Sequence, residues 1–369
     1  MLSPDIGSIM NILLPTLVAA LATFTIAPVV IGFARRFGFV DDPKTRYHPA
    51  HTHKGIIPRA GGLALFLGIA LSIVLFVPLT KLILGVLLGS AVLTLVGLAD
   101  DKKDVSPYIR LGINILAALV VVGFGAGIPY ITNPLTGGII PLDGWRISFE
   151  LFGRHSILVW SDLVALAWIL WTMNIVGWSA GVDGQMPGFV AISALTLGLL
   201  SLRFTIYDPS QLGVTILAFI VAGAFIGFIP WNFYPQKIMP GYGGKILAGF
   251  LLAILGILSY GKMGTALLVL GVPTMDAVYT LLRRLGSKKS PVWADRGHLH
   301  HRLLDLGWGK RRVALFYWGV SAILGAVALT VRSQEKLFAF LLVAVALAGF
   351  LVWLKYFSQL SKPQDPDSG

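Results

Sequence analysis

The sequence predicts an all-α bundle that crosses a membrane many times. Only 12% of its 369 residues are charged, about half of the roughly 25% found in soluble domains. The mean hydropathy is +0.80, and long apolar runs place the chain in the membrane class. Helices are expected because the sequence lacks the alternating pattern of a barrel, and lipid offers no partner to an unpaired backbone.

Eleven apolar segments predict eleven transmembrane helices, several shorter than the ~20 residues of a usual span. The segments cover residues 10–33, 60–79, 81–99, 109–129, 158–175, 187–202, 211–230, 246–260, 264–282, 313–331 and 336–355. The first run follows Asp5 rather than basic residues, so we expect a retained span and not a cleaved signal peptide. The chain has no cysteine, which excludes disulfides and thiolate metal sites.

Basic residues predict the orientation. Of the 29 Lys and Arg residues, 22 fall in one set of loops and seven in the other. The basic set covers residues 34–59, 100–110, 176–186, 231–245 and 283–312, with the tail from 355. The positive-inside rule places it in the cytoplasm, with the N-terminus outside and the C-terminus cytoplasmic. We expect one integral-membrane domain over 1–355, an external loop with strand-like alternation over 131–157, and a disordered cytoplasmic tail over 356–369.

Most of the net charge of +12 therefore lies on one face of the membrane. Two interpretations stay open: contact with anionic lipid headgroups, worth about 1 kcal/mol per basic residue, or a site for a phosphorylated substrate. The loop over 40–62 is basic and rich in histidine and proline, and His48 and Arg59 are its candidate phosphate contacts. The alternative interpretation is that this loop only fixes the orientation of the chain in the membrane.

Acidic residues mark two further loops. Asp100 and Asp101 end a span, where burial of a carboxylate is costly. The pair suits a divalent cation such as Mg²⁺, or a base beside a metal ligand; the alternative is a solvated helix end balanced by the two lysines that follow. Asn174 and Asp183 lie in a glycine-containing loop near the membrane surface, which either approaches a ligand closely or simply connects two spans.

Three histidines gather in DRGHLHHRLLDLG, residues 295–307. A helix over 298–304 would place His298, His301 and Arg302 on one face and His300 on another. The surrounding loop is strongly basic, which favours phosphate binding over a metal cage because positive charge repels a cation. A solvated interfacial helix is the third interpretation.

These motifs resemble, in matching order over roughly residues 35–312, those of the polyprenyl-phosphate N-acetylhexosamine-1-phosphate transferase family. DDPKTRYHPAHTHKGIIPRAGG is similar to its first cytoplasmic loop, GLADDKKDVSP to its aspartate pair, and DRGHLHHRLLDLG to its last catalytic loop. The HLHH form resembles the GlcNAc-1-phosphate branch more than the MurNAc-pentapeptide branch. The resemblance implies transfer of a sugar-1-phosphate, by default GlcNAc-1-phosphate, from a UDP-sugar to undecaprenyl phosphate in the bacterial cytoplasmic membrane, with release of UMP.

The resemblance also implies roles for individual residues. Asp100, Asp101 and Asp183 would be the catalytic acids, with Asp101 and Asp183 as ligands of Mg²⁺ or Mn²⁺. The implied substrate contacts are His48, Arg59, Asn174, Lys245, His298, His300, His301 and Arg302. The implied partners are a UDP-HexNAc, polyprenyl phosphate and membrane lipids, without nucleic acid, and a homodimer is left open.

Two motifs depart from the family pattern. Ala180 stands where the third loop usually has an acid, Tyr242 replaces an aspartate that the family uses for Mg²⁺, and Lys245 replaces a serine. RLGIN, residues 110–114, also follows the aspartate pair where the family more often has Lys and Gln. A neutral tyrosine is a poor Mg²⁺ ligand. Three alternatives follow: the remaining acids hold the metal alone, Lys245 supplies part of its charge, or the chain is an impaired homologue or transporter that binds substrates without turnover.

Overall fold

The computed structural model describes residues 6–45, 53, 55–133, 135–150, 154–259, 263–287 and 297–360. Helices dominate these ranges. They are α1 (Ile6–Phe37), α2 (Gly61–Phe76), α3 (Lys81–Lys103), α4 (Pro107–Gly123), α5 (Val159–Trp178), α6 (Gln185–Phe204), α7 (Gln211–Asn232), α8 (Gly241–Leu258), α9 (Met263–Val269), α10 (Gly271–Gly286), α11 (Leu299–Asp305), α12 (Lys310–Thr330) and α13 (Ser333–Leu360).

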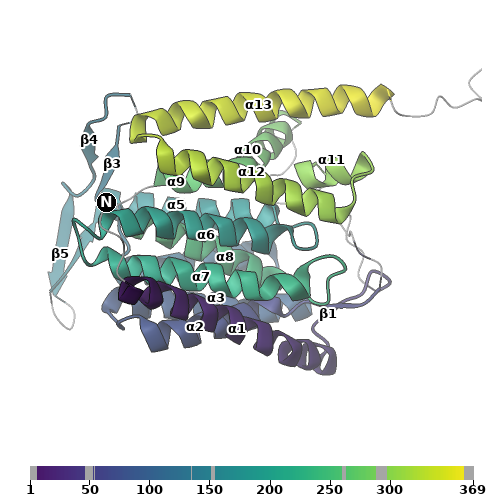
Figure 1. Cartoon of the computed structure of the whole chain (residues 1–369), viewed down its shortest axis with the longest axis horizontal. Helices are drawn as coiled ribbons and strands as arrows, with labels where there is room; N and C mark the ends of the chain where they lie inside the picture. The colour runs from purple at the N-terminus through teal and green to yellow at the C-terminus, as the bar shows by residue number, and fades with distance from the viewer. Residues whose placement is uncertain are drawn as a thin grey trace, which may run out of the picture.

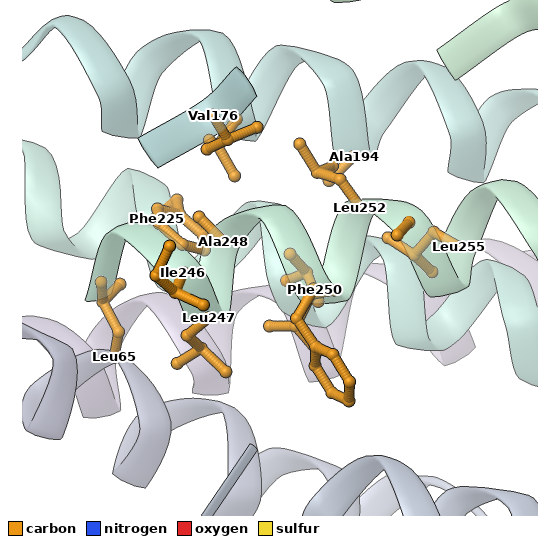
Figure 2. Close-up of a cluster of buried hydrophobic side chains, with 14 of the residues drawn as sticks. Leu65, Val176, Ala194, Phe225, Ile246, Leu247, Ala248, Phe250, Leu252 and Leu255 are labelled. Carbon is orange, nitrogen blue, oxygen red and sulfur yellow. The ribbon is translucent and has the colours of Figure 1, made fainter. Parts of the chain in front are cut away.

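Helix α8 lies at the centre of the bundle. The long helices run along the longest axis of the molecule, with α13 at one edge and α1 and α2 at the other (Figure 1). Helix α8 packs against α2, α3, α5, α6 and α7. Figure 2 shows its Ile246, Leu247 and Phe250 among side chains such as Leu65 of α2 and Phe225 of α7. Its apolar residues are buried on all sides, as expected of a helix enclosed by other helices.

Small residues bring the start of α8 close to its neighbours. A Cβ added at Gly62 of α2 would overlap the backbone of Gly244, and one added at Gly97 of α3 would overlap the backbone of Gly243. Helices in membranes associate largely through such close backbone packing. As a result, the first turn of α8 is fixed against the last turns of α3, where the aspartate pair lies.

Each predicted span contains a helix, and the helical membrane class is confirmed. Among the described residues, seven helices are long and apolar enough to cross a membrane, or eight if α9 and α10 form one bent span. These two helices meet at an angle of 82°, and together they contain the segment 264–282 that the sequence predicts as one span. Helices α2 and α4 have 16 and 17 residues, so the count of eleven spans stays a prediction.

The predicted cytoplasmic loops are shorter than expected. Helix α3 continues to Lys103 and α4 begins at Pro107, so little of the loop 100–110 remains. The apolar pattern ends before the helix does, because polar residues at a helix end do not stop it. Helix α13 likewise continues to Leu360, past the predicted start of the tail at 356; the first proline after it is Pro363.

Short antiparallel strand pairs lie at both ends of the bundle. The predicted external loop 131–157 contains two hairpins, β3 (Tyr130–Thr132) with β4 (Ile139–Pro141) and β5 (Arg146–Glu150) with β6 (Arg154–Leu158). A third pair, β1 (Val40–Asp41) with β2 (Ile57–Pro58), lies at the opposite end of the bundle, the end that also carries α11 (Figure 1). The basic loops and the hairpin loop therefore lie at opposite ends, while which end faces the cytoplasm stays a prediction.

Candidate active site

Residues from three predicted motifs meet at the end of the bundle that carries β1 and α11. Asp101, at the end of α3, is 4% exposed. Its Oδ1 accepts a hydrogen bond of 2.8 Å from the backbone N–H of Tyr242 and lies 3.4 Å from Nη2 of Arg59. Gly241 has a φ of +70°, and a Cβ there would overlap both Arg59 O and Asp101 Oδ2. Only glycine fits this junction.

The neighbouring Asp100 is paired with Arg110 of α4. Its Oδ1 lies 2.5 Å from Arg110 Nε and accepts a hydrogen bond of 3.0 Å from the N–H of Val105. Its Oδ2 is buried without a hydrogen-bond partner among the described residues. A carboxylate near a helix C-terminus faces the negative end of the helix dipole. The two arginines offset this unfavourable placement of Asp100 and Asp101.

Tyr242 occupies the space beside Asp100. Its hydroxyl donates to Oδ1 of Asn114 at 3.2 Å, and the Arg110 guanidinium lies 5.0 Å from its ring centroid. Tyr242, which departs from the family pattern, therefore contacts both Arg110 and Asn114 of the departing segment RLGIN. Because the Tyr242 ring packs against Arg110 and its hydroxyl is hydrogen-bonded to Asn114, we infer a structural role for this side chain.

Asp183, just before α6, has different partners. Its Oδ1 lies 2.9 Å from Lys310 Nζ and accepts a hydrogen bond of 3.1 Å from Gln236 Nε2. The following Gly184 donates its N–H to Asn232 Oδ1 at 3.1 Å. An acid at the start of a helix is favoured by the dipole. The loop before α6 is thus fixed to both α7 and α12.

The histidines form a buried stack at the start of α11. His298 is the N-cap residue, and its ring is parallel to that of His300 at 5.6 Å, with interplanar angle 5°. The His300 and His301 centroids are 4.3 Å apart. His300 is 1% exposed, and burial, followed by the charges of His301 and His298, lowers its pKa well below the usual 6.5. His300 is therefore neutral at pH 7.

Asp276 of α10 orients this stack. Its Oδ2 lies 3.0 Å from His298 Nδ1, and its Oδ1 accepts a hydrogen bond of 2.7 Å from the N–H of Leu299. The carboxylate therefore fixes the His298 ring and caps α11 at the same time. A buried acid within an apolar segment is the sequence signal for such a role, and the sequence-based site prediction did not include it.

Arg302 and Asn174 have structural partners. Arg302 donates from Nη2 to Tyr279 Oη at 3.0 Å and from Nε to Gly297 O at 3.2 Å. Asn174 donates from Nδ2 to Leu170 O at 2.8 Å within α5. His48 lies outside the described residues. The structure thus joins Arg59 to Asp101 and brings the histidines together.

Comparison with known proteins places these residues in a family. Residues 83–260 match the family model for glycosyl transferase family 4. The chain is 30% identical to the decaprenyl-phosphate N-acetylglucosaminephosphotransferase of Mycobacterium tuberculosis (strain ATCC 25618 / H37Rv), over 95% of this chain and 90% of the relative. The chain belongs to glycosyl transferase family 4. This confirms the family predicted from the motifs.

Two further relatives are also named as transferases. The chain is 26% identical to the probable undecaprenyl-phosphate N-acetylglucosaminyl 1-phosphate transferase of Bacillus subtilis (strain 168), over 88% of this chain and 86% of the relative. It is 27% identical to the phospho-N-acetylmuramoyl-pentapeptide-transferase of Moorella thermoacetica, over 85% and 96%. These relatives are phosphotransferases, and the apolar helices agree with an integral membrane protein.

The described donors of this family 4 site do not fit a divalent cation. Mg²⁺ prefers carboxylate oxygens in near-octahedral geometry. No group of three or more His, Asp or Glu side chains within the described residues is placed to hold a metal ion. The two predicted ligands, Asp101 and Asp183, each lie against a basic side chain instead. Of the three predicted catalytic acids, Asp100 has a buried oxygen, Oδ2, without a hydrogen-bond partner in the described part of the chain.

We expect Gly181→Ala to destabilise the family 4 protein by about 1–3 kcal/mol, the usual cost of overpacking. A Cβ at Gly181 would overlap Nε2 of His300 and displace its ring. Thermal unfolding in detergent measures this. The matched control is Gly112→Ala in α4, where a Cβ meets nothing within 4 Å. Equal unfolding temperatures for the two variants would contradict the close packing of Gly181 against His300.

The low pKa of His300 also predicts a pH dependence of stability. The folded state favours the neutral His300 ring. The contribution of this ring to the free energy of unfolding is therefore fully present above the unfolded pKa of about 6.5 and is lost as the pH falls below it. Between pH 6.5 and 5.5 the loss is about 1 kcal/mol. Chemical unfolding of the wild type and of His300→Gln at both pH values isolates this contribution. An equal pH dependence in the variant would show that His300 does not contribute.

Proposed function

We propose that the chain transfers GlcNAc-1-phosphate from UDP-GlcNAc to undecaprenyl phosphate in a bacterial cytoplasmic membrane, as the first step of a cell-envelope polysaccharide. Its relatives named as undecaprenyl- or decaprenyl-phosphate GlcNAc phosphotransferases support this substrate pair. The observation that carries the proposal is the direct contact between Asp101, Arg59 and the start of α8. These residues come from three separate motifs of the family and meet at one buried corner.

The reaction exchanges one phosphorus–oxygen bond for another. A phosphate oxygen of the lipid forms a bond to the β-phosphorus of UDP-GlcNAc. The bond from that phosphorus to the oxygen bridging to the α-phosphate breaks, and its electron pair leaves with UMP. The product is polyprenyl-diphospho-GlcNAc. Catalysis of phosphoryl transfer rests mainly on positioning and on stabilisation of negative charge.

The chain supplies an acid corner and a histidine stack for these tasks. Asp100 and Asp101 act at the lipid phosphate, where Asp101 accepts the proton of a monoprotonated phosphate as a general base. Arg59, His298 and His301 face the diphosphate of the nucleotide sugar. His300 is neutral and packs between the other two rings, so it positions them rather than supplying charge.

The alternative function is a protein that binds polyprenyl phosphate or nucleotide sugar without turnover. Tyr242 favours it, because its side chain contacts Asn114 and Arg110 and provides no metal ligand. Ala180 adds no acid to the third loop either. The homodimer stays a prediction from the resemblance.

The test uses the full chain in nanodiscs that contain undecaprenyl phosphate. UMP release is followed with UDP-GlcNAc, UDP-GalNAc and UDP-glucose. We expect release with UDP-GlcNAc and little with UDP-glucose, which lacks the acetamido group. Binding of UDP-GlcNAc without UMP release from any of the three donors would support the non-catalytic alternative.

A further inference from the structure

The acids of the candidate site are matched by basic side chains. Asp100 pairs with Arg110, Asp101 lies against Arg59, and Asp183 pairs with Lys310. A carboxylate attracts a divalent cation through its uncompensated negative charge. Here a basic side chain of the protein already lies beside each of these acids. The pairing therefore weakens the attraction of this site for Mg²⁺.

Two basic side chains near Asp101, at the start of α8, can still bind an anion. Nη1 of Arg59 is buried and has no hydrogen-bond partner among the described residues. A buried guanidinium donor left unpaired carries a desolvation cost that a ligand would remove. Lys245 lies in the first turns of α8, four residues after Gly241, where a Cβ would overlap Arg59 O and Asp101 Oδ2. Two cations from separate elements thus lie at the position where the start of α8 meets Asp101.

The contacts of Tyr242 keep this arrangement fixed. Its ring lies under the Arg110 guanidinium, and its hydroxyl is bonded to Asn114. This holds Arg110 against Asp100, so Arg110 remains in its ion pair. Among the described residues around Asp101, Arg59 and Lys245 are then the basic side chains left to contact a phosphate.

We propose that Arg59 and Lys245 bind the diphosphate of the nucleotide sugar directly, and that the site works without a divalent cation held by Asp101 and Asp183. The inference rests on the proposed function for the identity of the diphosphate. Guanidinium and ammonium groups bind phosphate through charge-assisted hydrogen bonds. Together they supply two positive charges, as one divalent ion would.

The experiment measures binding separately from turnover. Calorimetry with the full chain in nanodiscs gives the affinity for UDP-GlcNAc in Mg²⁺ and in EDTA. We expect the two affinities to agree within about twofold. Lys245→Gln should lower the affinity about tenfold, the typical effect of losing a hydrogen bond to a charged group, while uridine binding, which involves no phosphate, stays unchanged and shows that the variant is folded.

Electron paramagnetic resonance of Mn²⁺ gives the second readout. We expect the free Mn²⁺ signal to persist with excess wild-type protein and to decrease with Tyr242→Asp, which adds a carboxylate beside Asp100. Stoichiometric Mn²⁺ binding by the wild type, or UDP-GlcNAc binding that EDTA abolishes, would overturn the proposal. Failure of the proposed function looks different, because UDP-GlcNAc would then bind under neither condition or bind without forming UMP.

Discussion

Asp101→Asn is expected to lower the rate of UMP release about a thousandfold, within the range of 10²–10⁴ for a lost general base. The amide keeps the shape of the side chain and an oxygen for the N–H of Tyr242. It loses the negative charge that faces Arg59 and the capacity to accept a proton. Steady-state UMP release in nanodiscs measures the rate, and thermal unfolding shows that the variant folds.

The matched control is Asp104→Asn, one turn further along the chain. Asp104 lies 3.4 Å from the same Arg110 that pairs with Asp100, but its side chain is 46% exposed. We expect UMP release within about twofold of the wild type, since an exposed pair contributes little. If Asp101→Asn retained more than a tenth of the wild-type rate, a direct role for this carboxylate would be wrong.

Asp276→Asn is expected to lower kcat/KM for UDP-GlcNAc about 10- to 100-fold. Residues that orient a metal-ligating histidine typically have effects of this size, and we expect the same scale for a histidine that contacts phosphate. The amide can present N–H to His298 Nδ1, which changes the tautomer and the ring position, while its oxygen still caps Leu299. Kinetics across UDP-GlcNAc concentrations give the value.

Two further variants separate positioning from folding. Asp276→Ala loses the cap as well, so its unfolding temperature should fall below that of Asp276→Asn. Thr280→Val removes a hydroxyl 3.4 Å from His298 Nδ1, a longer contact, and should change kcat/KM no more than a few-fold. A kcat/KM for Asp276→Asn equal to that of the wild type would show that His298 needs no such orientation.

Hydropathy was sufficient to predict the helices but not their breaks. The apolar run over 264–282 continues through Leu270, where α9 and α10 meet at 82°. Gly271 and Pro273 lie directly after the break, and they are break signals that hydropathy does not detect. The extensions of α3 to Lys103 and of α13 to Leu360 were missed for a related reason, since helices continue beyond their apolar segments.

The site was predictable as a set of motifs and not as a set of contacts. The aspartate pair and the histidines were identified from their positions and charge. The pairing of Asp183 with Lys310 joins residues 127 positions apart, and no local pattern encodes it. Asp276 carried a signal, a carboxylate within an apolar segment, but its partnership with His298 required the structure.

The central claim is that the chain transfers a sugar together with a phosphate. UDP-GlcNAc labelled with ³²P at the β-phosphate tests it directly in nanodiscs that contain undecaprenyl phosphate. We expect the label to move into the organic-extractable lipid while unlabelled UMP appears in the aqueous phase. Label that stays in water-soluble UDP-GlcNAc or UDP, with no labelled lipid, would contradict sugar-phosphate transfer.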